Sequence, residues 1–203
     1  MKNAVKSVIT LTVITVVAGL LLGYVYEITK DPIAAKAQET KFNAYRAVFP
    51  AAADFKEAAG ADPSKASEIL NASGFTDERI DECLAAVDSS CTPLGYVLTV
   101  TTSKGYGGDI TVSMGVSSEG VLNGIEILDI SETAGLGMKA DTDQFKGQFK
   151  DKKVSQFNYT KSGASAEYEI DAISGATITT NAMVNAVNAG LVYTGSISGG
   201  QNE

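Results

Sequence analysis

A run of small and hydroxyl-bearing residues near the C-terminus has the composition and spacing to hold a phosphorylated ligand. It reads Asp171-Ala172-Ile173-Ser174-Gly175-Ala176-Thr177, and the apolar run Ala182–Tyr193 follows it. This pattern predicts a strand, a tight turn and then a helix. A helix N-terminus favours a neighbouring anion because its first amide groups are unpaired and lie at the positive end of the helix dipole. The small side chains would let a ligand approach the backbone, and the hydroxyl of Thr177 could carry a phosphate ester.

On chemistry alone Thr177, Thr179 and Thr180 are all possible acceptors, with the helix expected to begin near Thr179 or Thr180. Ordinary turn chemistry would also place small residues here. The order D-x-x-S-G-A-T, however, resembles the flavin-attachment motif of the FMN-binding subunits of Rnf and of the sodium-translocating NADH:quinone reductase. In that family a separate flavin transferase esterifies the last threonine with the phosphate of FMN. The resemblance therefore implies Thr177 as the acceptor, in a recognition context formed by Asp171, Ser174, Gly175 and Ala176.

A second segment, Ser131–Gly137, reads S-E-T-A-G-L-G and by itself predicts a flexible glycine loop. In the same family a segment E-T-P-G-L-G lines the flavin site. The resemblance implies cofactor contacts from Glu132, Thr133, Gly135, Leu136 and Gly137. Ala134 stands where proline is usual, so we expect a less rigid loop, because alanine leaves φ free. Lys104–Asp109 and Asp143–Phe149 also look like the glycine-rich hairpin and the short helix of the family.

The N-terminal stretch Ser7–Tyr26 carries no charge and, at about 1.5 Å per helical residue, spans roughly 30 Å, the thickness of a bilayer core. Lys2 and Lys6 precede it and acidic residues follow, so the positive-inside rule predicts a cytoplasmic N-terminus and an extracytoplasmic main domain. A cleaved signal peptide is the alternative, because Ala34–Ala37 loosely resembles a cleavage site. The apolar run is longer than such a peptide usually has. We therefore predict a single-pass protein of the inner (cytoplasmic) membrane.

The composition excludes several kinds of site. The 203 residues include no histidine, which excludes Ser-His-Asp and Cys-His catalysis and histidine-bound metals. Two cysteines cannot hold an ordinary iron–sulfur cluster; Cys83 and Cys91 could form a disulfide outside the cytoplasm, or equally stay free thiols. Without Lys2 and Lys6, 24 acidic and 14 basic side chains leave a net charge of −10, which argues against a nucleic-acid partner. We predict no catalytic residue and no metal ligand.

The remaining patterns predict an α+β fold, in which an N-terminal transmembrane helix precedes a mainly antiparallel sheet with packing helices. A helix is expected over Thr29–Phe49 with Pro32 in its first turn. Strands are expected near 96–101, 110–116, 121–131 and 166–170. We assign a cytoplasmic stub and anchor to 1–27, a helical membrane-proximal region to 28–90, an FMN-binding domain to 91–194 and a disordered polar tail to 195–203.

The resemblance implies that the chain corresponds to the G subunit of a membrane-bound Rnf-type complex, which couples electron transfer from ferredoxin to NAD⁺ to Na⁺ or H⁺ translocation. The chain would be an electron relay with covalent FMN and no complete active site of its own. Its partners would be the other membrane and peripheral subunits and a flavin transferase. The C subunit of the NADH:quinone reductase is the alternative within the family, although the shorter chain favours Rnf. A cofactor-free anchored interaction module is the alternative from another class, and it leaves the D-x-x-S-G-A-T segment unexplained.

Overall fold

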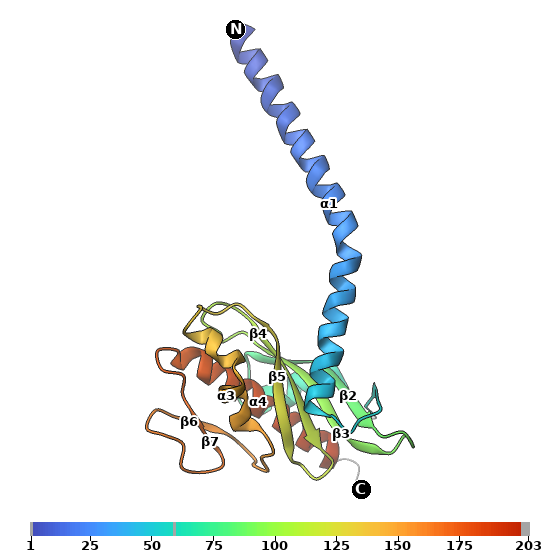
Figure 1. Ribbon diagram of the computed structural model, residues 1–203, viewed down its shortest axis with the longest axis vertical. Helices are drawn as coiled ribbons and strands as arrows, with labels where there is room; N and C mark the ends of the chain where they lie inside the picture. The colour runs from blue at the N-terminus through green and yellow to red at the C-terminus, as the bar shows by residue number, and fades with distance from the viewer. Residues whose placement is uncertain (1, 59, 200–203) are drawn as a thin grey trace. The chain divides into compact units, whose positions relative to one another are not determined.

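The computed structural model describes residues 2–58 and 60–199, and the chain falls into two compact units that divide between Thr40 and Lys41. The first unit is helical and belongs to α1 (Lys2–Val48), which is apolar and long enough to cross a membrane (Figure 1). Within it the hydroxyls of Thr10 and Thr12 each donate to the carbonyl four residues earlier, at 2.9 Å, so they are satisfied without water.

The prediction of a separate helix that starts near Thr29 is wrong, because α1 continues through Pro32. Proline removes one backbone hydrogen bond and crowds the preceding turn. Helix-forming residues on both sides outweigh that local cost, so Pro32 lies inside the helix and not in a first turn. The boundary predicted between Glu27 and Ile28 therefore falls within a single continuous element.

A five-stranded antiparallel sheet forms the centre of the second unit and confirms the predicted fold class. Its strands lie in chain order, each antiparallel to the next: β1 (Asp54–Glu57), β2 (Glu78–Val87), β3 (Pro93–Thr102), β4 (Ile110–Ser117) and β5 (Leu122–Ile130). The prediction of a helical region at 28–90 is wrong for β1 and β2, and a domain boundary at 90/91 would cut the sheet. Among the residues described between β1 and β2, α2 (Pro63–Ala72) is the helical element.

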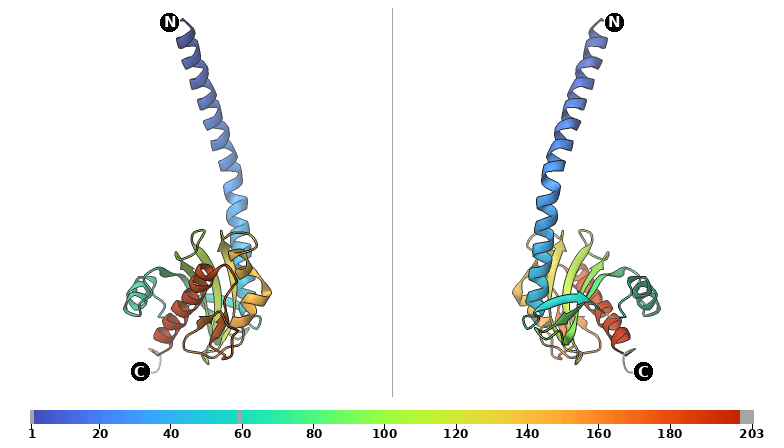
Figure 2. Two further views of the ribbon diagram at one scale, coloured as in Figure 1. Left: turned by 90° about the vertical axis from the view of Figure 1, so that its left-hand side faces the viewer. Right: turned by 90° about the vertical axis from the view of Figure 1, so that its right-hand side faces the viewer.

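One face of the sheet packs against α4 (Thr177–Gly199), and α2 lies beside α4 on the same face (Figure 2). Helix α4 lies close against the sheet at Gly190, where an added Cβ would lie 2.1 Å from the sulfur of Met114 on β4. The helix begins at Thr177, two or three residues before the predicted start near Thr179 or Thr180. It also runs through 195–199, so the prediction of a disordered tail is wrong there; residues 200–203 of that predicted tail lie outside the described residues.

The other face packs against the last turns of α1, where Tyr45, Val48 and Phe49 form a smaller apolar cluster. A Cβ on Gly115 of β4 would lie 2.7 Å from the carbonyl oxygen of Val48, so only glycine allows this approach. The hydroxyl of Tyr45 contacts the carboxylate of Glu82 and lies 2.8 Å from that of Thr99. These polar contacts, one buried and one partly buried, join the end of α1 to the sheet.

The chain between β5 and α4 contains only short elements: η1 (Gly137–Asp141), α3 (Asp143–Lys146), η2 (Gly147–Phe149), β6 (Asn158–Thr160) and β7 (Glu169–Asp171). The strand predicted at 166–170 is three residues long and pairs parallel with β6, apart from the main sheet. The amide side chain of Asn188 on α4 accepts from the N–H of Phe157 at 2.7 Å and donates to its carbonyl at 2.9 Å. These two buried hydrogen bonds hold the segment between β5 and α4 against α4.

Candidate functional site

The turn between β7 and α4 is fixed by its own backbone. The N–H of Ala176 donates to the carbonyl of Ile173 at 2.9 Å, and both side chains are buried. Gly175 has φ +79°, a left-handed conformation that glycine adopts without strain. The N–H of Ile173 donates to the hydroxyl of Thr180 at 3.0 Å. These hydrogen bonds therefore define the path of the chain from the end of β7 to the start of α4.

The three threonines at the start of α4 differ in access to solvent. Thr180 is 0 % exposed, and its hydroxyl donates to the carbonyl of Ala176 at 3.0 Å while it accepts from Ile173. Thr179 is 1 % exposed. Thr177 is only partly buried and begins the helix. Of these three hydroxyls, that of Thr177 is the one that an external enzyme could reach.

The first turn of α4 also supplies backbone donors. The N–H of Thr180 donates to the carbonyl of Ala176 at 3.0 Å, which closes the first helical turn. The amides of Thr177, Ile178 and Thr179 precede that bond and have no carbonyl within the helix to receive them. Unpaired amides at the positive end of a helix dipole favour an anion such as a phosphate. The helix itself is long enough for this dipole, since it continues to Gly199.

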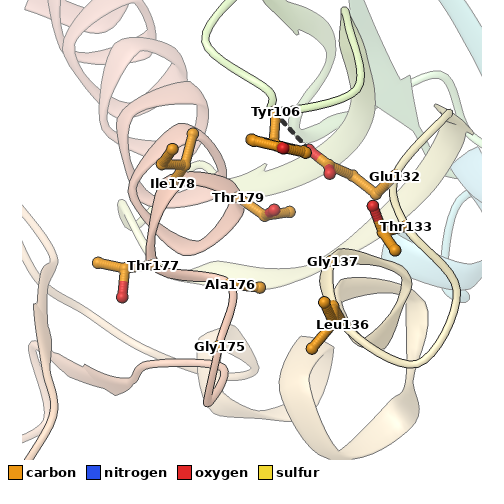
Figure 3. A pocket seen from close by; sticks show the side chains of 10 residues that line it. All are labelled: Tyr106, Glu132, Thr133, Leu136, Gly137, Gly175, Ala176, Thr177, Ile178 and Thr179. Atoms are coloured by element: carbon orange, nitrogen blue, oxygen red, sulfur yellow. Dashed lines mark hydrogen bonds between the residues drawn. The ribbon is translucent and has the colours of Figure 1, made fainter.

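A cavity of about 600 Å³ adjoins this helix start, within the ~300–1,000 Å³ typical of small-molecule sites. Three segments contribute to it: the hairpin between β3 and β4, the loop after β5, and the turn into α4 (Figure 3). The lining residues are Tyr106, Glu132, Thr133, Leu136, Gly137, Gly175, Ala176, Thr177, Ile178 and Thr179.

Backbone hydrogen bonds close the loop after β5 on itself. The N–H of Leu136 donates to the carbonyl of Thr133 at 3.1 Å, and Gly135 adopts φ +75°. A Cβ on Gly137 would lie 2.7 Å from both the Glu132 carboxylate and the Thr179 hydroxyl. The absence of a side chain at Gly137 therefore lets the loop, the carboxylate and α4 meet at one wall of the cavity.

Glu132 joins this loop to the glycine-rich hairpin. Its side chain is largely buried, and its Oε1 accepts from the N–H of Tyr106 at 2.7 Å. A Cβ on Gly107 would lie 2.0 Å from the carbonyl oxygen of Ser131, so the two backbones are in direct contact. The hairpin, the loop and the start of α4 thus form one continuous wall.

Seven of the predicted contact residues line this cavity: Thr177, Gly175, Ala176, Glu132, Thr133, Leu136 and Gly137. Gly135 does not line it. Asp171 and Ser174 line a second cavity of about 340 Å³ instead, so the structure does not bring them together with the other seven. Their contact with FMN stays a prediction.

Sequence reasoning did not assign Tyr106, Ile178 and Thr179 to the cofactor contacts. Two of them could have been found, because Ile178 and Thr179 directly follow the predicted acceptor. Tyr106 was noted only as part of a hairpin, and its place at the cavity depends on packing against a loop distant in sequence.

Asp171 supports the turn and does not face the first cavity. Its Oδ1 accepts from the N–H of Ala164 at 2.5 Å. Its own N–H donates to Oε1 of Gln148 at 2.6 Å, and its carbonyl accepts from Nε2 of Gln148 at 3.4 Å. These contacts hold the end of β7 against η2, from which the turn to Thr177 departs.

The cysteines lie away from both cavities and are free thiols. Cys83 is buried on β2, and burial, reinforced by the Glu82 carboxylate, raises the pKa of its thiol to about 12. Cys91 is exposed, and its sulfur accepts from Nζ of Lys56 at 3.1 Å. Among residues 2–58 and 60–199, no group of three or more Cys, Asp and Glu side chains comes together to hold a metal.

The first cavity fits a flavin nucleotide by the chemistry of its walls. Backbone amides and the Thr177 hydroxyl lie at the start of α4, where a phosphate would be stabilised. Tyr106, Leu136 and Ile178 supply aromatic and aliphatic surface for a planar ring. Glu132, Thr133 and Thr179 add polar groups on the same walls.

Comparison with known proteins gives matches over most of the chain. Residues 105–192 match the FMN-binding domain family and residues 1–48 match the RnfG N-terminal region. The chain is 32% identical over 201 residues to the G subunit of an ion-translocating oxidoreductase complex of Methanosarcina acetivorans, with 98% of each chain covered. It is 36% identical over 194 residues to the G subunit of a Na⁺-translocating ferredoxin:NAD⁺ oxidoreductase complex of Acetobacterium woodii, covering 92% of this chain and 89% of the relative. The crystal structure of Shewanella oneidensis NqrC overlaps 59% of each chain at 19% identity, with a TM-score of 0.49.

Proposed function

The chain belongs to the family of G subunits of ion-translocating oxidoreductase complexes, and we propose that it carries FMN as a phosphoester on Thr177 and relays electrons within an Rnf-type complex. As a member of that family it is an electron-transfer subunit with an FMN-binding domain and an apolar N-terminal helix. The observation that carries the proposal is the position of Thr177. Thr177 is partly exposed, begins α4 and lines the 600 Å³ cavity.

The residues of this chain would bind and orient the cofactor in two parts. The amides at the start of α4 would hold the phosphate by hydrogen bonds and by the helix dipole. Leu136 and Ile178 would exclude water from the ring, while Glu132 and Thr133 would offer polar contacts to its heteroatoms. Asp171 would act at a distance, because it fixes the turn that presents Thr177. FMN, when bound, supplies the electron-carrying chemistry that the side chains of this chain lack.

A covalent link suits a cavity that is open to solvent on a domain outside the cytoplasm. A dissociable cofactor would be lost by dilution, whereas a tether keeps its effective concentration high. The uncharged helical segment Ser7–Tyr26, with Lys2 and Lys6 before it, supports a cytoplasmic N-terminus and an extracytoplasmic main domain. A flavin transferase would therefore act on Thr177 at the outer side of the membrane.

We further propose that the chain works beside the other membrane and peripheral subunits of its complex and passes electrons between their centres. The complex would move Na⁺ or H⁺, since relatives are named for each ion: the G subunit of A. woodii for Na⁺ and the G subunit of Clostridium ljungdahlii, 28% identical over 191 residues, for protons. This chain would not complete an active site alone.

The test is the intact mass and the in-gel flavin fluorescence of full-length protein produced with a flavin transferase. The wild type should carry the mass of FMN less one water and fluoresce after denaturation, and Thr177→Ala should do neither. Thr179→Val tests the neighbouring hydroxyl as a rival acceptor; that hydroxyl is on a buried residue, so the variant should keep its covalent flavin even if a polar contact at the cavity wall is lost. A fluorescent Thr177→Ala band, or a wild type that weighs no more than its polypeptide, would refute the proposal.

A further inference from the structure

Tyr106 is the most exposed of the large apolar and aromatic side chains described between residues 41 and 199, at 71%. Six such side chains are exposed in this part of the chain: Phe42, Tyr106, Leu136, Tyr159, Tyr168 and Ile178. Three of them, Tyr106, Leu136 and Ile178, line the 600 Å³ cavity, although they come from three different segments. Half of the exposed large apolar and aromatic side chains described in this part of the chain therefore meet at one place on the domain.

The exposure of Tyr106 does not come from a loose hairpin. Its N–H donates to the carboxylate of Glu132 at 2.7 Å. A Cβ on Gly105 would lie 2.1 Å from the carbonyl oxygen of Gly108, and one on Gly107 would lie 2.0 Å from that of Ser131. The residues on both sides of Tyr106 are thus fixed by close backbone contacts. A tightly held backbone that presents a bare aromatic ring at a cavity is typical of a ligand contact.

We propose that Tyr106 is an aromatic contact of the flavin ring, and that Leu136 and Ile178 complete an apolar rim around that ring. The inference rests on the proposed function, because it takes FMN as the occupant of the cavity. Figure 3 shows Tyr106 and Ile178 on the side of Thr179 away from Leu136, with Thr177 at a separate edge. A ring tethered at Thr177 would lie between surfaces of the kind that planar aromatic groups pack against.

The chemistry of the rim favours a planar, largely apolar group. Its exposed members are one aromatic and two aliphatic side chains, and none of the three carries a charge. The hydroxyl of Tyr106 makes no hydrogen bond within the described residues, so the ring is free to adjust to a ligand. Covering these side chains removes apolar surface from water, which stabilises the bound ring.

Two other tyrosines provide matched controls. Tyr159 and Tyr168 are also exposed, at 38% and 46%, and neither lines the first or the second cavity. Replacing one of them changes the same kind of surface side chain without touching the rim.

The experiment measures native flavin fluorescence in full-length protein produced with a flavin transferase, divided by the fluorescence of the same sample after unfolding. A phenol in contact with a flavin quenches its fluorescence by donating an electron to the excited ring, and the electron returns with no net reaction. A phenyl ring is a much poorer electron donor. We expect Tyr106→Phe and Tyr106→Leu to raise the ratio severalfold, and Tyr168→Leu to leave it at the wild-type value.

The time-resolved decay of the flavin fluorescence anisotropy separates loss of the ring contact from the change in fluorescence lifetime. Tyr106→Phe keeps a ring in place, so its anisotropy should decay with the slow rotation of the wild-type protein, whereas Tyr106→Leu should add a fast component from local motion of the flavin. An unchanged ratio in Tyr106→Phe with flavin attached would overturn this inference alone. A wild type that shows no flavin after unfolding would instead overturn the proposed function, and this inference with it.

Discussion

The segment Asp171–Thr177 has two halves that face different cavities. Asp171, Ala172, Ile173 and Ser174 line the 340 Å³ cavity beside α3 and η2, whereas Gly175, Ala176 and Thr177 line the 600 Å³ cavity beside the loop after β5. In the first half the polar groups of Asp171 are already paired, with Ala164 and Gln148. In the second half Thr177 is partly exposed, and the first amides of α4 precede the helical hydrogen bonds.

This difference shows that residues adjacent in one motif need not share a role. The first half uses its hydrogen bonds to fix the chain, and the second half leaves its polar groups available to a ligand. Thr180 connects the two, because its hydroxyl accepts from Ile173 in the first half and donates to Ala176 in the second. A rigid first half would present Thr177 in a defined place, which a transferase and a bound ring would both require.

Removing the hydroxyl of Thr180 should have the largest effect on stability and on flavin attachment. In Thr180→Val the N–H of Ile173 loses its acceptor within the protein interior, and a buried unpaired donor costs about 1–3 kcal/mol. We expect the free energy of unfolding of the flavin-free chain to fall by that amount in urea, and the yield of attached flavin to fall as well. Thr180→Ser keeps the hydroxyl and should stay closer to the wild type. Equal stability of the two variants would show that the halves are not joined through this hydroxyl.

Gly175 tests the second half alone. A side chain at φ +79° costs about 1–2 kcal/mol in the left-handed region, and its Cβ would lie 3.1 Å from Cδ2 of Leu136. The control is Gly163→Ala, which has φ +96° and no atom within 4 Å of the new Cβ. We expect Gly175→Ala to lose more stability in urea than Gly163→Ala and to carry less flavin. If both lost the same stability and kept their flavin, the contact with Leu136 would have no role.

Replacing Gln148 tests whether the first half contributes to flavin attachment. Gln148→Ala removes the acceptor that lies 2.6 Å from the N–H of Asp171, a hydrogen bond worth about 0.5–1.5 kcal/mol. Gln144→Ala is the control, since Gln144 lines the same cavity and makes no hydrogen bond through its side chain within the described residues. We expect Gln148→Ala to slow flavin attachment in a timed reaction with the transferase, and Gln144→Ala to match the wild type. Equal rates for all three proteins would confine the role of the first half to folding.

The sequence predicted those parts of the fold in which local pattern and tertiary environment agree. Alternating side chains identified β3, β4 and β5, and charge-free length identified the apolar part of α1. It missed β2, which is rich in charges and has register shifts at Ile80/Glu82 and Ala86/Val87 that change the phase of its alternation. It missed β1 because four residues carry little pattern, and pairing with β2 determines that strand.

The site residues also divide into those that a local sequence pattern predicts and those that only tertiary contacts place. Thr177, Gly175 and Ala176 could be predicted because one contiguous segment carries their chemistry. Tyr106 could not, because its place depends on the hydrogen bond to Glu132, 26 residues away in the chain. The direction of Asp171 depends on the turn around Ala164, which has no distinctive sequence pattern.

A change of pH should produce the smallest effect, and it should act on the loop that leads into the first half. The carboxylate of Glu169 accepts from the N–H of Ser165 at 2.7 Å, from its hydroxyl at 2.9 Å and from the N–H of Ala166 at 3.2 Å. The Ser165 amide, followed by the other donors, lowers the pKa of this carboxyl below its ordinary 4.5. A depressed pKa in the folded state means that the stabilisation is present above pH 4.5 and is lost as the pH falls through the folded value.

We therefore expect acidification below pH 4.5 to reduce the hydrogen-exchange protection of the Ser165 and Ala166 amides, after correction for intrinsic exchange rates. Amides within α4, beyond its first turn, should keep their protection, because this carboxylate does not contact them. Glu169→Gln has no titrating group, so its protection at Ser165 should not change with pH. If protection fell equally in this loop and in α4, acidification would be unfolding the whole domain, and the loop before Asp171 would not have a separate pH response.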